Sequence, residues 1–446
     1  MQLILLSGGS GKRLWPLSNN TRSKQFLTLL EKEDGLKESM LQRVVRQAKE
    51  AMLTKDITLV TNTSQSGIIT NQLGGSVAIV TEPERRDTFP AIALAASFLK
   101  FVKKCSDKEV VVIMPCDTYT EANYFHTIRK MVEFVDANVA DLILMGIIPT
   151  HPSEKYGYVI PESVESMTEY KKVAHFAEKP TLEYAKKYIA QKAYWNGGVF
   201  AFHLGYMIDI VKKYIPSNSF ATIRSRYSEF PKISFDYEVA EKAGAVAVVP
   251  FTGQWKDLGT WDSLTDEIHN PIIGNAIMGA HCHNTHVINE LKIPIYVDGL
   301  ENVIVAACPN GFLVCDKKYS EKIKEYVEKT PSLPMYEECS WGTYHVLDYS
   351  TFENEQYSLT KSITINSGKS IPYQTYHHCS KVLTFVQGEG TLSIDGHEQK
   401  IMVGDTIVIP INHLYSIKAT TVLVFIEVQV GGLLADEKDM YKNEWE

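Results

Sequence analysis

Residues 2–13 read Gln2-Leu3-Ile4-Leu5-Leu6-Ser7-Gly8-Gly9-Ser10-Gly11-Lys12-Arg13, an apolar run that passes directly into a glycine-rich loop. The aliphatic run predicts a strand over residues 2–7 that is buried on both faces. Three glycines in four positions let the backbone approach a ligand closely and turn its N–H groups inward, as an anion-binding loop requires. The glycine spacing matches neither a P-loop nor the Gly-x-Gly-x-x-Gly pattern of a dinucleotide fold.

The charged residues around this loop are basic, although the chain as a whole is acidic. The first 30 residues contain Lys12, Arg13, Arg22 and Lys24 and no acidic residue, whereas the whole chain has a net charge of −8. Such a local positive field suits a polyanionic ligand. The alternative is a glycine turn whose charges are simply solvated.

Working outward from the loop, short apolar runs alternate with stretches of helical period. Strands are expected at residues 57–62, 77–82, 110–116 and 142–148, and amphipathic helices at residues 39–53, 88–104 and 123–135. This alternation predicts an α/β domain with a doubly wound, mostly parallel sheet.

The later part of the chain changes character. Residues 275–316 are rich in short β-like segments, with a turn at Pro309-Asn310-Gly311, and a helix is expected at residues 318–329. Residues 330–334 (Thr-Pro-Ser-Leu-Pro) read as a linker, and residues 340–431 are nearly all alternating strand, with a hairpin turn at Asp395-Gly396. We therefore expect three parts: residues 1–265, a β-rich connecting segment with a helix over 266–330, and a small β-barrel over 335–446.

Composition bounds the class of protein. The 446 residues are 44% hydrophobic and 22% charged, which is an ordinary globular balance. The longest apolar runs have about seven residues against the ~20 of a membrane-spanning helix, and no signal-peptide pattern opens the chain. Seven scattered cysteines without a Cys-x-x-Cys pair favour a reducing compartment. We expect a cytoplasmic protein that binds neither membrane nor nucleic acid.

The stretch from Leu6 to Ser18, followed by Lys24-Gln25-Phe26-Leu27, resembles the signature of bacterial mannose-1-phosphate guanylyltransferases. These enzymes belong to the nucleotide-sugar pyrophosphorylase superfamily, so the resemblance implies the Rossmann-like nucleotide-diphospho-sugar transferase fold. It also implies that Arg13 and Lys24 are catalytic and contact phosphate. The loop residues implied to bind the nucleotide are Ser7, Gly8, Gly9, Ser10, Gly11 and Lys12; the family usually has Thr in place of Lys12 and Pro in place of Ser23.

A second block, Glu82-Pro83-Glu84-Arg85-Arg86-Asp87-Thr88-Phe89-Pro90-Ala91, is similar to the family's Glu-Pro-x-Gly-Arg-Asn-Thr-Ala-Pro-Ala. By resemblance it lies beside guanine, with Glu82, Arg86 and Asp87 binding the nucleotide. Arg85 replaces Gly and Asp87 replaces Asn, although a carboxylate can accept from the guanine N–H groups. The alternative is that Arg86 and Asp87 cap the helix that begins at Thr88.

Two aspartates are candidate metal ligands. Asp117 follows the apolar run of residues 110–116, and ligand sites in doubly wound sheets lie at the carboxyl ends of strands. Asp257 lies in Trp255-Lys256-Asp257-Leu258-Gly259-Thr260-Trp261, which is similar to the family's Trp-Ser-Asp-Val-Gly-Ser-Trp. Because Mg²⁺ favours one or two carboxylates with phosphate oxygens and water, we expect Mg²⁺ or Mn²⁺ at Asp117 and Asp257, with Asp117 also catalytic.

Three further blocks resemble the family's sugar side. They are Glu178-Lys179-Pro180, Trp195-Asn196-Gly197-Gly198-Val199-Phe200 and Ser234-Phe235-Asp236-Tyr237-Glu238. By resemblance Glu178 and Asn196 bind sugar hydroxyls, Lys179 meets the sugar phosphate, and Gly157 gives room for the ring.

The last part resembles the cupin that many of these enzymes carry as a phosphomannose isomerase half. Gln374-Thr375-Tyr376-His377-His378-Cys379-Ser380-Lys381 is similar to the metal-binding motif Gln-x-His-His-His-Arg-x-Glu. Tyr376 replaces a His, Lys381 replaces the Glu, and Tyr415 occupies a later His position, with His413 close by. Lysine offers no lone pair at neutral pH, so we expect neither a catalytic metal nor isomerase activity in this cupin.

Together these patterns predict a nucleotidyltransferase that makes GDP-mannose or a close relative from GTP and a hexose-1-phosphate and releases pyrophosphate. The alternatives are the same reaction with another sugar phosphate or nucleotide, and a non-catalytic homologue that binds a nucleotide sugar and regulates a partner. The connecting segment resembles the family's short β-rich segment after the catalytic domain, which often supports oligomerisation, so the resemblance allows a homo-oligomer.

Overall fold

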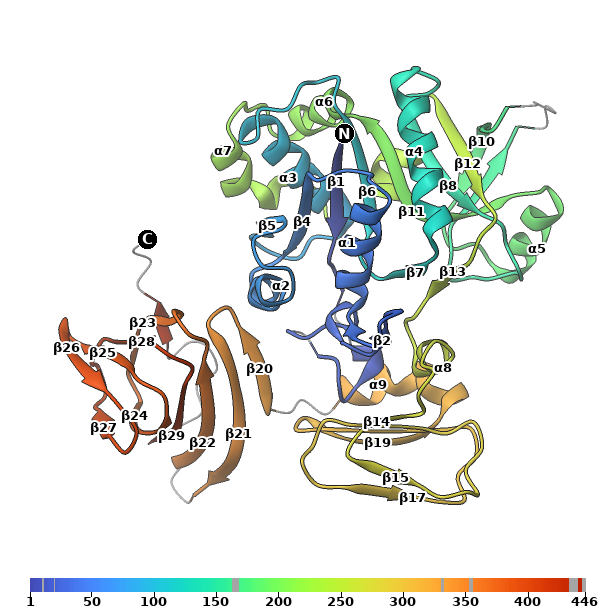
Figure 1. Cartoon of the computed structure of the whole chain (residues 1–446). Coiled ribbons are helices and arrows are strands. Elements are labelled where there is room, and N and C mark those ends of the chain that lie inside the picture. The colour runs from blue at the N-terminus through green and yellow to red at the C-terminus, as the bar shows by residue number, and fades with distance from the viewer. Residues whose placement is uncertain are drawn as a thin grey trace. The chain divides into compact units, whose positions relative to one another are not determined.

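The computed structural model describes residues 1–9, 12–19, 21–162, 168–329, 333–352, 356–432 and 440–442. The chain forms two compact units. The first contains Met1–Gly11 and Ser23–His269, and the second contains Lys12–Arg22 and Asn270–Glu446 (Figure 1). Each unit is described by itself.

A nine-stranded sheet forms the centre of the first unit, in the order β5-β4-β1-β6-β11-β8-β12-β10-β9. Seven strands run in one direction and two, β10 and β11, run against them. The doubly wound, mostly parallel sheet expected from the sequence is confirmed. The strands are β1 (Gln2–Leu6), β4 (Ile57–Asn62), β5 (Ala78–Glu82), β6 (Val110–Pro115), β8 (Leu142–Ile147), β9 (Tyr158–Pro161), β10 (Lys171–Ala177), β11 (Tyr194–His203) and β12 (Val246–Phe251).

Helices cover both faces of this sheet because successive side chains of a strand point to opposite faces. Leu3 and Leu5 of β1 pack in one core, and Ile4 between them packs in the other. The first core also receives α1 (Met40–Glu50), α2 (Ser66–Leu73), α4 (Ala122–Asp136) and α5 (Leu182–Ala190). The second receives α3 (Thr88–Phe101), α6 (Leu204–Tyr214) and α7 (Phe220–Ser225).

Small elements lie next to the ends of these strands. The 3₁₀ turn η2 (Lys24–Phe26) follows the signature segment, and β7 (Thr118–Thr120) follows β6. The strand β7 pairs antiparallel with β13 (Trp255–Asp257), and α8 (Trp261–Thr265) begins at a capping box made by Thr260 and Ser263.

The connecting segment of the second unit consists of short strands in one four-stranded and one two-stranded sheet. Parallel pairs join β14 to β16 and β16 to β18. The strand β19 pairs antiparallel with β18 after a turn at Pro309-Asn310, within the predicted turn Pro309-Asn310-Gly311. The helix expected at residues 318–329 starts as 3₁₀ turn η6 (Lys317–Lys322) and becomes α9 (Ile323–Val327); residues 330–332 of the expected linker lie outside the described residues. The strands are β14 (Ile272–Gly274), β15 (Ala276–Met278), β16 (His286–Asn289), β17 (Ile295–Val297), β18 (Val303–Cys308) and β19 (Gly311–Asp316).

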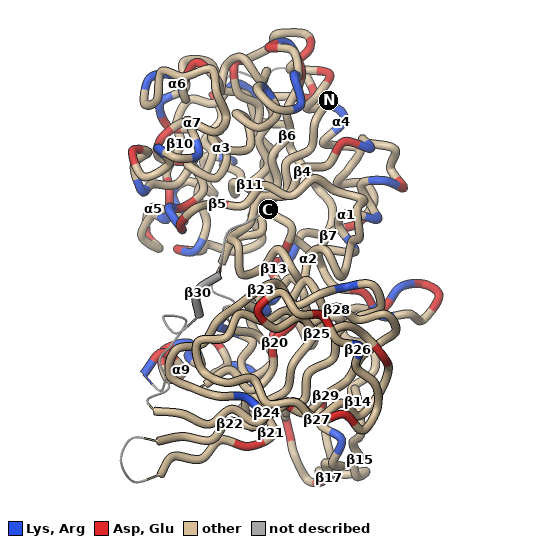
Figure 2. Tube along the Cα trace, turned by 90° about the vertical axis from the view of Figure 1, so that its left-hand side faces the viewer, with Lys and Arg blue, Asp and Glu red and all other residues tan. Residues whose placement is uncertain are grey.

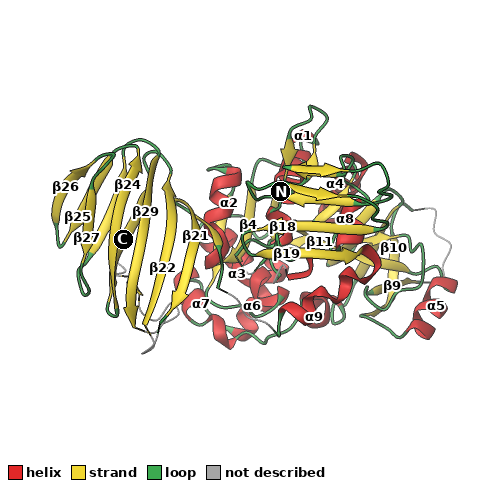
Figure 3. Cartoon of the chain, turned by 90° about the horizontal axis from the view of Figure 1, so that it is seen from below, coloured by secondary structure: helices red, strands yellow, loops and turns green. Residues whose placement is uncertain are grey.

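The remaining strands form the expected barrel from two sheets, β20-β21-β22-β29-β24-β27 and β26-β25-β28-β23-β30, with β22, β24 and β29 visible side by side in Figure 3. Asp395 and Gly396 both have positive φ, as the predicted two-residue hairpin requires. The strands are β20 (Tyr336–Cys339), β21 (Gly342–Thr351), β22 (Gln356–Ile365), β23 (Ser370–Tyr376), β24 (Cys379–Gln387), β25 (Gly390–Ile394), β26 (His397–Ile401), β27 (Thr406–Ile409), β28 (Tyr415–Ala419), β29 (Leu423–Gly432) and β30 (Met440–Lys442).

Both units carry acidic and basic residues. Basic and acidic positions are interspersed along the trace in Figure 2. Among the described helices, none combines the length and the apolar character that crossing a bilayer needs.

Candidate active site

The glycine loop begins where β1 ends. The Ser7 hydroxyl accepts a hydrogen bond from Gln25 Nε2 at 3.0 Å, and the Ser23 hydroxyl donates to the Gly9 carbonyl at 3.1 Å. Gly9 has a φ of +118°, and a Cβ added at Gly8 or Gly9 would meet no atom within 4 Å. Neighbouring packing therefore does not require these glycines; the positive φ favours glycine at position 9, and the open backbone leaves room for a ligand. Ser10 and Gly11 lie outside the described residues.

Lys24 stands at the centre of a charged cluster in the first unit. Its Nζ lies 2.9 Å from Asp117 Oδ2 and 2.6 Å from Asp257 Oδ1. Burial by itself lowers the pKa of Lys24, but the charges of Asp117 and Asp257 outweigh it and hold that pKa above its ordinary value. The ammonium is therefore charged at neutral pH, and two carboxylates 140 positions apart in the sequence converge on one cation.

Strand pairing brings the two carboxylates together. Asp117 lies just beyond the carboxyl end of β6, and Asp257 lies opposite Thr118 in the β7–β13 pair. Among the described residues no cluster of three or more His, Cys, Asp or Glu side chains is suited to a metal. These two carboxylates fit Mg²⁺, which takes its other ligands from substrate phosphate and water, provided that the Lys24 ammonium turns away from them toward a phosphate.

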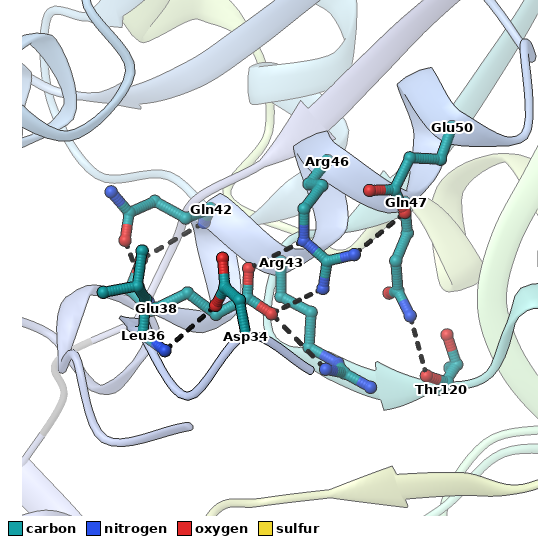
Figure 4. Close-up of polar contacts among 10 residues, drawn as sticks. Asp34, Leu36, Glu38, Gln42, Arg43, Arg46, Gln47, Glu50 and Thr120 are labelled. Carbon is teal, nitrogen blue, oxygen red and sulfur yellow. Dashed lines mark hydrogen bonds and ion pairs between the residues drawn. The ribbon is translucent and has the colours of Figure 1, made fainter. Parts of the chain in front are cut away.

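Helix α1 is held by a buried ion pair with Glu38, which precedes it, and by one hydrogen bond to β7. Glu38 has a side chain that is 1% exposed and lies 2.6 Å from Arg46 and 3.4 Å from Arg43 (Figure 4). One turn further on, Gln47 Nε2 donates to the Thr120 carbonyl of β7 at 3.2 Å. The helix thus holds the strand that follows Asp117, a support that the sequence analysis did not identify.

The block expected beside the base is built around a helix cap. Asp87 has a φ of +74°, and its Oδ1 accepts from the Thr88 N–H at 2.7 Å at the start of α3. Arg86 Nε donates to the Phe230 carbonyl at 3.1 Å, so Arg86 does not cap this helix. Glu82 accepts from the Tyr227 hydroxyl at 2.5 Å, and burial raises the pKa of Glu82. The capping alternative is confirmed for Asp87, and one oxygen of Asp87 is engaged in it.

The residues expected on the sugar side lie together. A Cβ added at Gly157 would come 2.3 Å from Glu178 Oε2 and 3.5 Å from Asn196 Cβ, so only glycine allows this approach. Lys179, whose side chain is 63% exposed, lies 3.2 Å from Glu178. Asn196 Nδ2 donates to Asp236 Oδ1 at 2.6 Å.

Asp236 is a further polar residue of this group, to which the sequence analysis assigned no role. It begins the π-helical turn Asp236–Ala240, and burial raises its pKa. Burial followed by the charge of Asp236 also raises the pKa of Glu178. The signal for Asp236 was its place in the block Ser234-Phe235-Asp236-Tyr237-Glu238.

Two expected residues belong to the other unit. Lys12 and Arg13 lie in the 3₁₀ turn η1 (Lys12–Leu14), which packs on α9 of the second unit. The Lys24 cluster of the first unit is therefore built without them, and their catalytic role stays a prediction.

Comparison with known protein families agrees with the fold. Residues 2–271, more than half of the chain, match the nucleotidyl transferase family. The chain belongs to this family. Residues 334–444 match a second family, described as the C-terminal part of mannose-6-phosphate isomerase.

Individual relatives extend over both parts of this nucleotidyl transferase. The chain is 28% identical to the mannose-1-phosphate guanylyltransferase of Escherichia coli K12, over 97% of this chain and 96% of that protein. It is also 28% identical to the xanthan biosynthesis protein XanB of Xanthomonas campestris pv. campestris B100, with the same coverage. A crystal structure from Thermus thermophilus, described as mannose-1-phosphate geranyltransferase, superposes with a TM-score of 0.60 at 26% identity, over 74% of this chain and 98% of that one.

The interior of the barrel holds an ion pair at the positions where metal ligands were considered. Lys381 Nζ lies 3.2 Å from Glu427 Oε2, and their side chains are 3% and 4% exposed. The same ammonium lies 3.6 Å from the centre of the Tyr376 ring, and Gln374 Nε2 donates to the Tyr415 hydroxyl at 2.7 Å. A buried ammonium repels a dication, so these residues do not fit a metal ion.

The histidine that was considered as a substitute ligand has another partner. His413 Nδ1 lies 2.5 Å from Asp395 Oδ2, at the hairpin between β25 and β26. His377 Nδ1 lies 2.6 Å from Asn412 Oδ1. In each imidazole the Nδ1 atom is therefore used in a contact with a neighbouring side chain.

Proposed function

We propose that this nucleotidyl transferase makes GDP-mannose from GTP and mannose-1-phosphate and releases pyrophosphate. The observation that carries the proposal is the convergence of Asp117 and Asp257 on the Lys24 ammonium beside the glycine loop. The guanylyltransferase named among the relatives supports the choice of GTP and mannose-1-phosphate.

The reaction needs two anions to be aligned while their repulsion is neutralised. An oxygen of the sugar phosphate attacks the α-phosphorus in line, a new P–O bond forms, and the bond to pyrophosphate breaks with its electron pair leaving on pyrophosphate. Mg²⁺ or Mn²⁺ held by Asp117 and Asp257 supplies positive charge to the phosphate oxygens.

The chain's own residues supply the rest of the neutralisation. Lys24 contributes an ammonium that the carboxylates keep charged and oriented, and the Gly8 and Gly9 backbone contributes N–H groups. The resemblance of the signature implies that Arg13 and Lys12 add positive charge at the triphosphate, and Lys179, whose exposed ammonium pairs with Glu178, would meet the sugar phosphate.

Specificity is assigned to the two flanking groups. The second carboxylate oxygen of Asp87 accepts from the N–H groups of guanine, with Glu82 and Arg86 holding the block in place. Glu178 and Asn196, which approach each other across Gly157, bind sugar hydroxyls.

The C-terminal barrel takes no part in an isomerase reaction in this proposal, because Lys381 and Glu427 fill the region where a metal would lie. We place the reaction in the cytoplasm. All seven cysteines are free thiols, including the buried Cys116, Cys308 and Cys379, as a reducing compartment allows.

Product analysis tests the proposal. Purified protein with GTP, mannose-1-phosphate and Mg²⁺ should yield GDP-mannose and pyrophosphate in equal amounts, measured by chromatography and mass spectrometry. Release of inorganic phosphate or GDP without a nucleotide sugar would contradict it. Binding of GDP-mannose without any turnover would favour the regulatory alternative.

A further inference from the structure

Arg22 links the signature segment to the C-terminal unit. The segment Lys12–Arg22 belongs to the second unit. The residues before and after it, Met1–Gly11 and Ser23–His269, belong to the first unit. Within the second unit the segment is closely packed: Cys308 Sγ donates to the Pro16 carbonyl at 3.1 Å, and a Cβ added at Gly311 would come 2.5 Å from the Trp15 ring.

The Arg22 guanidinium forms the polar part of this packing. Its Nη1 lies 2.8 Å from Glu290 Oε2 and its Nη2 lies 3.0 Å from Glu290 Oε1, which is a two-point ion pair. Its Nε lies 3.7 Å from Glu338 Oε1, and its Cζ lies 5.8 Å from the Tyr336 ring centre. The Arg22 side chain is only 13% exposed. One guanidinium therefore joins the connecting segment, through Glu290, to β20, the first strand of the barrel.

The backbone of Arg22 is fixed as firmly as its side chain. Its N–H donates to Asn19 Oδ1 at 2.7 Å, and its carbonyl accepts from the Asn19 N–H at 2.9 Å. Because a two-point Arg–carboxylate pair fixes direction as well as distance, the ion pair with Glu290 orients the whole end of the signature segment.

Lys24 follows only two residues later. Two residues span at most about 7 Å of chain, and Ser23 between them bonds to the Gly9 carbonyl and to Gln65 Nε2 at 3.1 and 2.6 Å. Arg22 is therefore joined to Lys24 through a single residue, Ser23, whose hydroxyl also holds Gly9 of the glycine loop. In transfer reactions a misplacement of about 1 Å can cost roughly 10²-fold in rate.

We propose that Arg22 is a positioning residue through which Glu290 and the barrel strand β20 set the geometry of the signature segment, and that this gives the C-terminal barrel a role in nucleotidyl transfer. The proposal rests on the proposed function for its rate effect and on geometry alone for its effect on the segment. No contact between Arg22 and substrate is required.

Two readouts on the full chain test it. The first is kcat and KM for GTP and mannose-1-phosphate in the wild type and in Arg22→Gln, Glu290→Gln and Glu338→Gln. The second is hydrogen exchange of the backbone amides of residues 12–27, which needs no turnover. Arg226→Gln is the matched control, because Arg226 makes a two-point ion pair with Glu229 at 2.6 and 2.7 Å within the first unit.

Arg22→Gln should lower kcat at least tenfold with both KM values within about threefold of wild type, and residues 12–27 should exchange faster. Glu290→Gln should have a similar effect, and Glu338→Gln should change both readouts in the same direction by a smaller amount. Arg22→Lys should keep only part of the wild-type kcat, because an ammonium cannot pair with a carboxylate at two points. Arg226→Gln should change neither readout.

Unchanged exchange of residues 12–27 in Arg22→Gln would overturn the proposal, as would a wild-type kcat in that variant or an equal loss in Arg226→Gln. If Glu338→Gln changed neither readout, the barrel strand β20 would have no part in positioning the segment. If the wild type releases no pyrophosphate, the proposed function fails, and the exchange measurement still decides whether Arg22 positions the segment.

Discussion

The Lys24 ammonium lies 2.6 Å from a carboxylate oxygen of Asp257, a residue 233 positions away in the chain. The same ammonium meets Asp117 at 2.9 Å, so the signature segment, the end of β6 and the strand β13 share one charged centre. This centre is the part of the molecule on which the proposed phosphate chemistry depends.

Neutralising either carboxylate should abolish most turnover. Asp117→Asn and Asp257→Asn remove charge that a divalent cation requires as a hard oxygen ligand, and wild-type activity should require Mg²⁺ or Mn²⁺. Pyrophosphate release measures this, with Asp209→Asn, an exposed carboxylate of α6, as the control. Full activity of either variant in excess EDTA would contradict the metal assignment.

Removing the cations of the signature segment should lower the rate more than it disturbs folding. Loss of one preorganised contact to the transition-state phosphate costs on the order of 10²-fold, and we expect this for Lys24→Ala and for Arg13→Ala. Lys213→Ala on the exposed side of α6 serves as the control. Near-normal rates together with an unchanged melting temperature would refute a catalytic role.

The base preference can be separated from the helix cap at Asp87. Asparagine accepts at a cap and tolerates positive φ, so Asp87→Asn should keep the melting temperature. Because the similar family block has Asn at this position, Asp87→Asn should also keep most of kcat/KM for GTP, whereas Asp87→Ala should lower it tenfold or more and leave the weak reaction with ATP unchanged. Equal effects on GTP and ATP would show that Asp87 is a structural cap only.

The buried ion pair of the barrel should matter to stability and be insensitive to pH near neutrality. Lys381→Met removes the ion-pair partner of the buried Glu427 and leaves it only the charge of Lys361 across the β22–β29 pair, so the cost should be at most about 3–5 kcal/mol, the range typical of breaking a buried pair; Lys381→Met/Glu427→Leu should cost less. Denaturant unfolding of the C-terminal unit, followed through the barrel's tyrosines, measures both. A single variant as stable as the wild type would show that the pair contributes little.

The direction of the pH effect follows from the pKa of Lys381. Burial lowers that pKa, but the charge of Glu427 outweighs burial and raises it well above the ordinary value. The stabilisation is therefore fully present below about pH 10.4, the ordinary lysine value, and is lost as the pH rises through the higher folded-state pKa. A loss of this contribution between about pH 7 and 9, well below that ordinary value, would contradict the assignment.

The barrel should also lack bound metal and isomerase activity. Elemental analysis of purified protein should find no stoichiometric zinc, and mannose-6-phosphate should not be converted to fructose-6-phosphate. Stoichiometric metal in the C-terminal domain with isomerase turnover would show that the comparison of Lys381 and Tyr415 with metal ligands is wrong.

The sequence was sufficient to predict the elements that repeat a simple pattern. The buried strands β1 and β6 are nearly continuous apolar runs, as β8 is apart from Gly146, and the strand-end rule then placed Asp117 correctly. The strand β11 was missed because Gly197 and Gly198 interrupt it, where the pairing register shifts beside Asn196.

Partners across long sequence distances were not predictable. Alternation along a strand shows which face a residue occupies but does not show which charge lies opposite. For this reason the pairs Lys381–Glu427, Asn196–Asp236 and Arg22–Glu290 emerged only from the three-dimensional arrangement. These pairings depend on strand register and on loop packing.

The most direct test of the central claim is kcat/KM for pyrophosphate release over a grid of nucleoside triphosphates against hexose- and heptose-1-phosphates. We predict the highest value for GTP with mannose-1-phosphate, at least tenfold above every other pair, and its loss in Asp117→Asn. A tenfold preference for CTP, UTP or ATP, or for another sugar phosphate, would contradict it.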